Sequence, residues 1–123
     1  MDQWYTSKVL RGNQSGRTIN FPTVNLYPTI IPQETKQGVY ASIVRYQEQL
    51  YKGALYFGPR LVVGETKIVL EIYILDFDKE IYDETIEFQI KDFIRGVQDF
   101  DSFEEMKREL QEDVQKVKTL LTT

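Results

Sequence analysis

The chain of 123 residues contains no cysteine and no histidine. Without cysteine there is neither a disulfide framework nor a thiolate nucleophile, and without histidine there is no imidazole base. These absences exclude a Ser-His-Asp triad and a zinc site built from Cys and His. Any metal must be held by oxygen atoms, which favour Mg²⁺ or Ca²⁺.

The chain also lacks an excess of positive charge and any long apolar run. Fifteen Lys and Arg against nineteen Asp and Glu give a net charge of -4. Because nucleic-acid backbones usually bind a clustered basic surface, we expect no broad nucleic-acid interface. No segment approaches the ~20 apolar residues of a membrane span, and the first residues do not form a signal peptide. We therefore expect a soluble, cytoplasmic protein.

Short β-rich segments separated by turn residues dominate the first three quarters of the chain. Gln47–Gln49 is expected to form the loop of a hairpin, and three prolines should keep Tyr27–Lys36 irregular. About six short strands favour a small barrel, and the length suits one domain over residues 1–123. The expected strands are Tyr5–Leu10, Phe21–Leu26, Gly38–Tyr46, Leu50–Phe57, Ile68–Leu75 and Thr85–Phe93.

The end of the chain changes to helical periodicity. Apolar residues recur every three or four positions from Phe103 to Leu121, as one face of a helix requires. Ser102 and Glu105 form an S-x-x-E capping box. The pattern predicts a helix at about 102–121, which we expect to lie across an opening of the barrel.

Glu71 is the only charged residue within the apolar run Ile68–Leu75. Strand alternation places it on one face with Val69, Tyr73 and Leu75. Because burying a lone carboxylate is costly, a partly desolvated Glu71 is a candidate general base. A strand end that is simply hydrated is the alternative interpretation.

A second candidate is the segment Gly12–Asn25, GNQSGRTINFPTVN. Glycines let backbone N–H groups approach an anion closely, so this loop is a candidate phosphate nest. It is not a Walker A loop, because Gly12 and Gly16 enclose three residues rather than four and Arg17 replaces the lysine. The alternative is an ordinary glycine turn that leads into a strand.

Several ordered segments together resemble the riboflavin kinase (flavokinase) family over nearly the whole length. The sequence departs from the family pattern at Asn20, which replaces a glycine, at Val24, which replaces an alanine, and at Leu61–Val63, which replaces Pro-Thr-Phe. The matching segments are Gly16–Asn25, Gly38-Val39-Tyr40, Glu71 with Asp76-Phe77-Asp78 and Tyr82, Ile94-Arg95, and Phe100-Asp101-Ser102 with Asp113.

This resemblance implies a mainly β fold, a six-stranded Greek-key barrel with a C-terminal α-helix. It also implies transfer of the γ-phosphoryl group of ATP to the 5′-hydroxyl of riboflavin, with Mg²⁺, giving FMN and ADP. Phosphoryl transfer depends on positioning and charge neutralisation, so it needs neither Cys nor His.

The resemblance further implies a role for each matched residue. Arg95 has a structural alternative, which is an ion pair with Asp99 or Asp101. The implied roles are Glu71 as catalytic base; Thr23 and Asn25 as Mg²⁺ ligands; Gly12, Gly16, Arg17, Thr23 and Asn25 at the nucleotide; and Asn25, Glu71 and Arg95 at the flavin.

We expect the partners to be small molecules, riboflavin and ATP, and the protein to be a monomer without nucleic-acid or membrane contacts. The sequence starts almost at the barrel, without the adenylyltransferase domain of many bacterial relatives. FAD synthesis is therefore expected from a separate protein or a missing domain. Two other hypotheses stay open: a non-catalytic flavin- or nucleotide-binding module on the same barrel, and a barrel that binds single-stranded nucleic acid.

Overall fold

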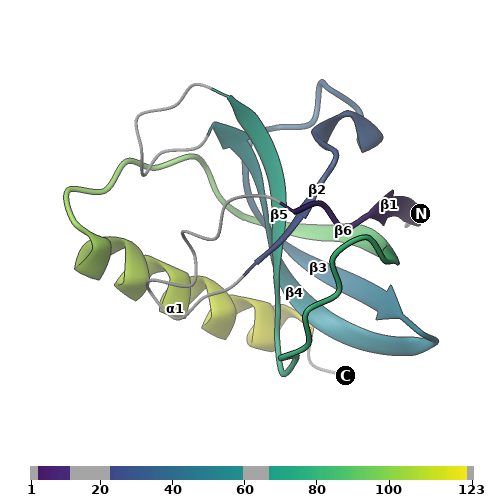
Figure 1. Ribbon diagram of the computed structural model, residues 1–123. Coiled ribbons are helices and arrows are strands. Elements are labelled where there is room, and N and C mark those ends of the chain that lie inside the picture. Colours follow the sequence, from purple (N-terminus) through teal and green to yellow (C-terminus); the bar gives the residue numbers. More distant parts are fainter. Residues whose placement is uncertain (1–2, 12–22, 60–66, 122–123) are drawn as a thin grey trace.

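The computed structural model describes residues 3–11, 23–59 and 67–121, with the backbone alone at Phe103. The predicted residues Gly12, Gly16 and Arg17, and the departures at Asn20 and Leu61–Val63, lie outside this part of the chain. The elements, drawn in Figure 1, are β1 (Tyr5–Lys8), β2 (Val24–Leu26), a 3-10 turn (Pro28–Ile30), β3 (Gly38–Tyr46), β4 (Gln49–Pro59), β5 (Ile68–Ile74), β6 (Thr85–Arg95) and α1 (Phe103–Leu120).

The described strands form one antiparallel six-stranded sheet in the order β1-β6-β3-β4-β5-β2. A backbone hydrogen bond of 2.7 Å from Leu10 N to Asn25 O joins the segment after β1 to β2. Because β1 and β2 are the two edge strands, this contact curls the sheet into a nearly closed barrel. The predicted mainly β barrel with a C-terminal helix is confirmed.

The hairpin between β3 and β4 is tighter than expected. Tyr46 pairs with Gln49, so only Gln47 and Glu48 form the loop rather than Gln47–Gln49. Both have left-handed backbone angles, with φ of 49° and 65°. This is the conformation of a two-residue turn that ordinarily carries Asn and Gly, and their absence hid the turn in the sequence.

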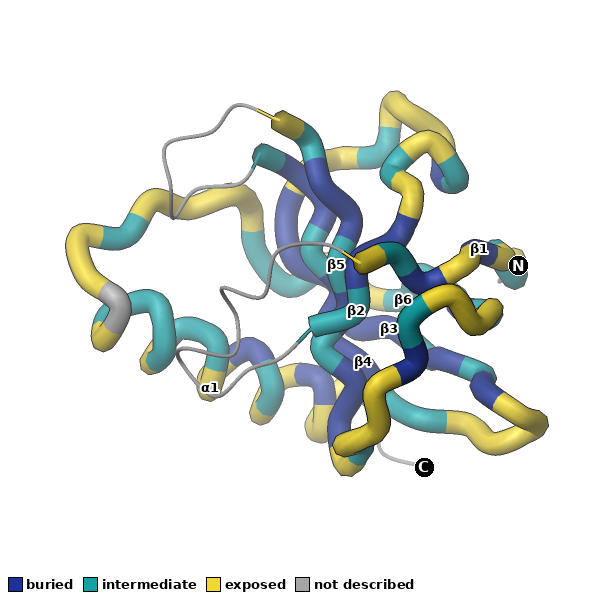
Figure 2. Tube along the Cα trace, in the orientation of Figure 1, coloured by how far each residue is buried: buried dark blue, intermediate teal, exposed yellow. Residues whose placement is uncertain are grey.

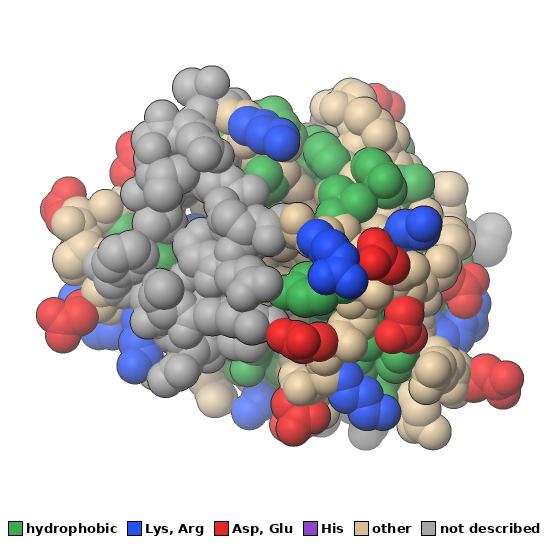
Figure 3. All heavy atoms as spheres, viewed as in Figure 1, with side chains coloured by type: hydrophobic (Ala, Val, Ile, Leu, Met, Phe, Trp, Pro, Cys, Tyr) green, Lys and Arg blue, Asp and Glu red, His purple; other side chains and the backbone are tan. Residues whose placement is uncertain are grey.

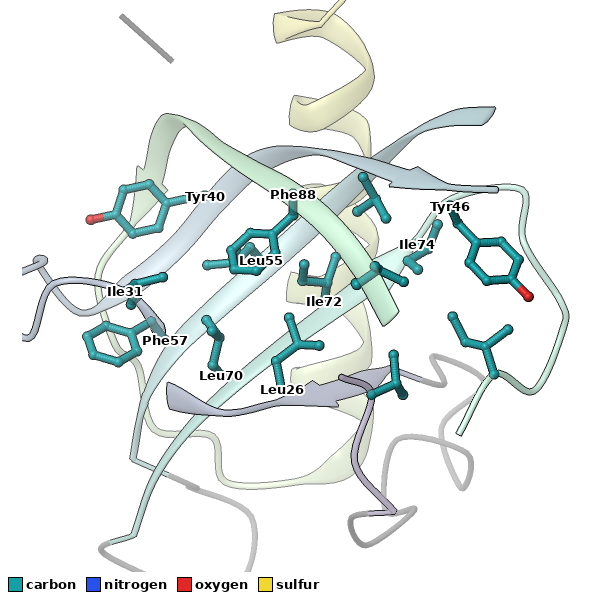
Figure 4. Close-up of a cluster of buried hydrophobic side chains, with 14 residues drawn as sticks. Leu26, Ile31, Tyr40, Tyr46, Leu55, Phe57, Leu70, Ile72, Ile74 and Phe88 are labelled. Atoms are coloured by element: carbon teal, nitrogen blue, oxygen red, sulfur yellow. The ribbon is translucent and has the colours of Figure 1, made fainter. Parts of the chain in front are cut away.

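The barrel interior is a single apolar core. Alternate residues of every long strand point inward, among them Tyr40 and Val44 of β3, Leu55 of β4 and Leu70 of β5. Figure 4 shows Tyr40, Leu55 and Leu70 pointing into the space between the strands, with α1 behind the sheet. Figure 2 shows the corresponding buried stretches along the strands, while exposed residues gather at the β3–β4 turn and along α1.

The helix α1 packs on the outer face of the barrel wall. It contacts β4, β3 and β6. Val117 lies in a second buried cluster with Ala41 of β3, Ala54 of β4 and Leu75. The expected position across a barrel opening is therefore wrong: the two small alanines on the outer face let the helix approach the wall.

The start of α1 follows the predicted capping box. Ser102 is the N-cap, and its Oγ accepts a hydrogen bond of 3.1 Å from the backbone N–H of Glu105. This bond satisfies one of the free N–H groups at a helix start. The pairing of β6 therefore fixes the start of the segment between β6 and α1, and the Ser102 cap fixes its end.

Candidate active site

One row of paired residues crosses five strands of the barrel and contains most of the candidate site. Asn25 on β2 pairs with Glu71 on β5, and Glu71 pairs with Tyr56 on β4. Tyr56 in turn pairs with Val39 on β3, and Val39 with Arg95 on β6. Directly paired residues have Cβ atoms about 4.5–5.5 Å apart. The register therefore gathers residues from positions 25 to 95 into one band.

Glu71 lies on the outer face of β5, the face of Tyr73 and Leu75, with which strand alternation groups it. Its neighbours Leu70 and Ile72 are buried in the barrel core, whereas Glu71 is half-buried on the opposite side. Thr23, just before β2, donates a hydrogen bond of 3.2 Å from Oγ1 to Glu71 Oε1. A hydroxyl that donates its proton in this way keeps lone pairs with which it can accept from a donor or bind a cation.

Asn25 is buried beside this pair, with only 8% of its surface exposed. Within the described ranges its side-chain amide makes no hydrogen bond, although a buried amide ordinarily has a partner. A hydroxyl, an amide oxygen and a carboxylate thus meet at one place. This is the set of oxygen donors that Mg²⁺ prefers.

The acidic residues of the described ranges do not gather into a ready-made metal cluster. A Mg²⁺ ion at Thr23 and Asn25 would therefore take few ligands from protein. Mg²⁺ commonly binds in this way where substrate phosphates and water complete its six ligands.

Tyr56 stands between Glu71 and Arg95 in the row, and sequence reasoning missed it. Its hydroxyl donates to the carbonyl oxygen of Pro59, at the end of β4. Burial raises the pKa of Tyr56 to about 12, the negative charge of Glu71 adds to this rise, and the positive charge of Arg95 opposes it. The phenol is therefore neutral at physiological pH. Only the pairing of β4 with β5 brings Tyr56 opposite Glu71, so no local pattern could have marked it.

Arg95 forms a two-pronged ion pair with Asp113 of α1. Its Nε donates to Asp113 Oδ1 at 3.0 Å and its Nη2 donates to Oδ2 at 2.9 Å. The alternative partners Asp99 and Asp101 are wrong. The reason is a bulge in β6: Val39 pairs with Arg95 but Tyr40 pairs with Phe93, so one extra residue turns the strand end toward the helix.

Asp113 is almost completely buried, with 1% of its surface exposed. Burial raises the pKa of this carboxyl group, and the hydrogen bonds from Arg95 oppose that rise. The sequence did carry a signal: Asp113 falls at helical spacing between Leu110 and Val117, within the apolar face. A charged residue in such a face needs a partner, but the sequence did not show which one.

The chain is similar to one family of known proteins over nearly its whole length. The family model described as Flavokinase, riboflavin kinase, matches residues 3–121. A bifunctional riboflavin kinase/FMN adenylyltransferase of Haemophilus influenzae is 32% identical over 94% of this chain and 38% of its own length. The RNA-binding riboflavin kinase RibR of Bacillus subtilis is 34% identical over 86% of this chain and 46% of its own length.

Among solved structures, a macrolide-efflux protein of Streptococcus pneumoniae superposes with a TM-score of 0.82 at 29% identity, over 95% of this chain and 38% of its own. The riboflavin kinase of Trypanosoma brucei superposes with a TM-score of 0.68 at 22% identity, over 98% of this chain and 80% of its own. The latter likeness shows a shared fold.

The chain belongs to the riboflavin kinase family. It spans less than half the length of the two curated relatives described above. This riboflavin kinase-family chain has no described helix that is both long and apolar enough to cross a membrane.

The family's expected site residues fall into two groups in this structure. Thr23, Asn25 and Glu71 lie together at one end of the row, and Arg95 lies at the other end. Tyr56 lies between them, and Asp113 holds Arg95 from the helix. Gly12, Gly16 and Arg17 remain predictions, because they lie outside the described residues.

Proposed function

We propose that this protein is a riboflavin kinase that transfers the γ-phosphoryl group of ATP to the 5′-hydroxyl of riboflavin, giving FMN and ADP. Membership of the riboflavin kinase family supports the reaction. The observation that carries the proposal is the meeting of Thr23, Asn25 and Glu71 on paired strands. This arrangement offers a proton acceptor beside oxygen ligands for a cation.

Glu71 is the proposed general base. Its carboxylate takes the proton of the 5′-hydroxyl as that oxygen attacks the γ-phosphorus, and the bond from this phosphorus to the bridging oxygen of ADP breaks. The hydrogen bond from Thr23 orients one carboxylate oxygen. The half-buried position of Glu71 limits the hydration of its carboxylate, which favours proton transfer to this group.

Thr23 and Asn25 are the proposed protein ligands of Mg²⁺. When bound, the ion would neutralise negative charge on the phosphates, which is a main requirement of phosphoryl transfer. Asn25 supports this role because it is buried with an amide that no described side chain or backbone group satisfies. We also assign both residues to the nucleotide site, and Asn25 and Glu71 to the ribityl side of the flavin.

The remaining site assignments follow from the family pattern. Gly12, Gly16 and Arg17 would cover the ATP phosphates, because a glycine loop with an arginine suits an anion. Arg95 belongs to the flavin side. The Arg95 side chain is 15% exposed. Its Cζ atom lies 5.6 Å from the centroid of the Phe100 ring.

We propose that the partners are small molecules and that the protein acts as a cytoplasmic monomer without nucleic acid. Figure 3 shows acidic and basic side chains interspersed on the face in view, rather than a basic stripe. The net charge of -4 agrees. RNA binding is named for the Bacillus relative, whose length is about twice the matched segment.

The test is to incubate the purified protein with riboflavin, ATP and Mg²⁺ and to follow FMN by chromatography. Glu71→Gln keeps the shape of the side chain but removes the base, so kcat should fall about 10²–10⁴-fold. Thr23→Ala should raise the Mg²⁺ concentration needed for half-maximal activity. Glu48→Gln makes the same chemical change as Glu71→Gln on the exposed β3–β4 turn and should leave kcat unchanged.

Two results would contradict the proposal. Unchanged turnover by Glu71→Gln would remove Glu71 as the base. Tight riboflavin binding without any FMN would favour the non-catalytic flavin-binding module instead.

A further inference from the structure

Arg95 has more N–H donors than the described residues around it accept. A guanidinium group carries five N–H donors in a fixed plane. Asp113 accepts from Nε and Nη2, and the carbonyl oxygen of Gly96 accepts from Nη1 at 3.2 Å. Two N–H groups, one on each terminal nitrogen, therefore have no acceptor within the described ranges. Because Asp113 takes the edge formed by Nε and Nη2, the remaining N–H of Nη2 lies on the edge that it shares with Nη1, a fork where an incoming oxygen can accept from both nitrogens.

The direction of this fork is set by groups around it rather than by the strand alone. The bulge at Ile94 turns Arg95 to the helix side. Gly38, with φ of 150°, lets the start of β3 approach so closely that a Cβ there would overlap the carbonyl oxygen of Arg95. The bulge in β6 and the close contact with Gly38 of β3 thus fix the backbone from which the Arg95 side chain extends.

Asp113 holds the other end of Arg95. Both of its carboxylate oxygens are engaged, and the carboxyl group is buried among helix and sheet residues. A two-pronged pair restricts the rotation of the guanidinium plane, which a single contact would not do. Without Asp113 the flexible side chain would have several orientations open to it.

We propose that Asp113 is a positioning residue of the kinase: it fixes the guanidinium plane of Arg95 so that the two remaining N–H groups bind an acceptor oxygen of a substrate. This inference rests on the proposed function. With Arg95 on the flavin side, the expected acceptor is a carbonyl oxygen of the flavin ring. A phosphate oxygen of the nucleotide offers the same hydrogen-bond acceptor chemistry, and the test distinguishes the two.

The experiment compares Asp113→Asn with the wild type and with Glu112→Gln in steady-state kinetics. Asp113→Asn keeps the size of the side chain but replaces one acceptor oxygen by an NH₂ group. Glu112→Gln makes the equivalent change at the neighbouring, exposed position of α1. We expect Asp113→Asn to raise the KM of one substrate about 10- to 100-fold, the cost of a misaligned charged hydrogen bond.

The two KM values distinguish the sources of the acceptor oxygen. A rise confined to riboflavin identifies the flavin ring, and a rise confined to ATP identifies a phosphate. In either case kcat at saturation and the KM of the other substrate should stay near the wild-type values, as should all constants of Glu112→Gln.

A double variant tests whether Asp113 acts through Arg95. In an Arg95→Ala background, Asp113→Asn should cause no further rise in KM, because the fork is already absent. If Asp113→Asn does not fold, Arg95→Lys supplies the test. It keeps a positive charge for Asp113 but lacks the planar fork, and it should produce the same rise in KM.

Lower thermal stability of Asp113→Asn with both KM values unchanged would overturn the inference, because Asp113 would then be only a link between helix and barrel. If the wild type makes no FMN, the proposed function fails first. The inference is then decided by the dissociation constants of riboflavin and ADP, measured separately for wild type and Asp113→Asn. Equal constants for the two proteins overturn it.

Discussion

The two faces of the same barrel wall differ sharply in chemistry. Leu70 and Ile72 on β5 point inward and are fully buried among apolar side chains, whereas Glu71 between them points outward, opposite Asn25 and Tyr56. The inner face stabilises the barrel, and the outer face carries the proposed chemistry. One strand can serve both because successive side chains point to opposite faces.

This division makes the site dependent on register. The row from Asn25 to Arg95 exists only while five strands keep their pairing. A slip of one residue would move Leu70 outward and Glu71 into the core. The apolar inner face opposes such a slip, so the core protects the geometry of the site.

Leu70→Ala offers the largest effect on stability and tests the division directly. Removing a fully buried leucine should lower the free energy of unfolding by about 2–5 kcal/mol. Urea unfolding followed by fluorescence gives this value, and kcat of the folded protein should stay near that of the wild type. Glu71→Gln should show the reverse pattern. Comparable losses of both stability and kcat in both variants would show that the faces are not independent.

Gly38→Ala should affect both faces at once. The added Cβ would overlap the Arg95 carbonyl oxygen and lie 2.9 Å from the ring of Phe93. Alanine is also disfavoured at the positive φ of Gly38. Together with this overlap, it should lower the free energy of unfolding by about 1–3 kcal/mol. Because Arg95 must shift, substrate affinity should fall as well.

Gly96→Ala is the matched control for Gly38→Ala, since a Cβ at Gly96 meets nothing within 4 Å. It lies next to Arg95 on the other side and should be close to neutral in stability and affinity. A strong effect at Gly96 with none at Gly38 would contradict the role given to the β3 contact.

The smallest expected effect lies at the β3–β4 turn, which belongs to neither face. Replacing Gln47 and Glu48 by Asn and Gly would supply residues suited to φ of 49° and 65°. The double variant should be more stable by about 1 kcal/mol in urea unfolding. FMN formation should be unchanged, and a change in kcat would show that the turn communicates with the site.

Much of the fold could be read from local patterns. Alternation and β-branched residues indicated six strands near their observed positions, and Ser102 with Glu105 marked the start of α1. Glu71 stood out because a charge interrupted an apolar run. Asn25 ended the candidate glycine loop Gly12–Asn25, but its role as a ligand, and the choice of Arg95, came from the resemblance to a family.

The sequence by itself therefore determined the strands, the helix and the residues that share a face with Glu71, because these depend on residues a few positions apart. Only the tertiary structure decided that α1 packs on the outer wall, that Tyr56 stands opposite Glu71, and that Arg95 meets Asp113. Those facts depend on strand register, a bulge and the close approach of Gly38 to β6. They arise from contacts between residues far apart in the chain, which no local pattern records.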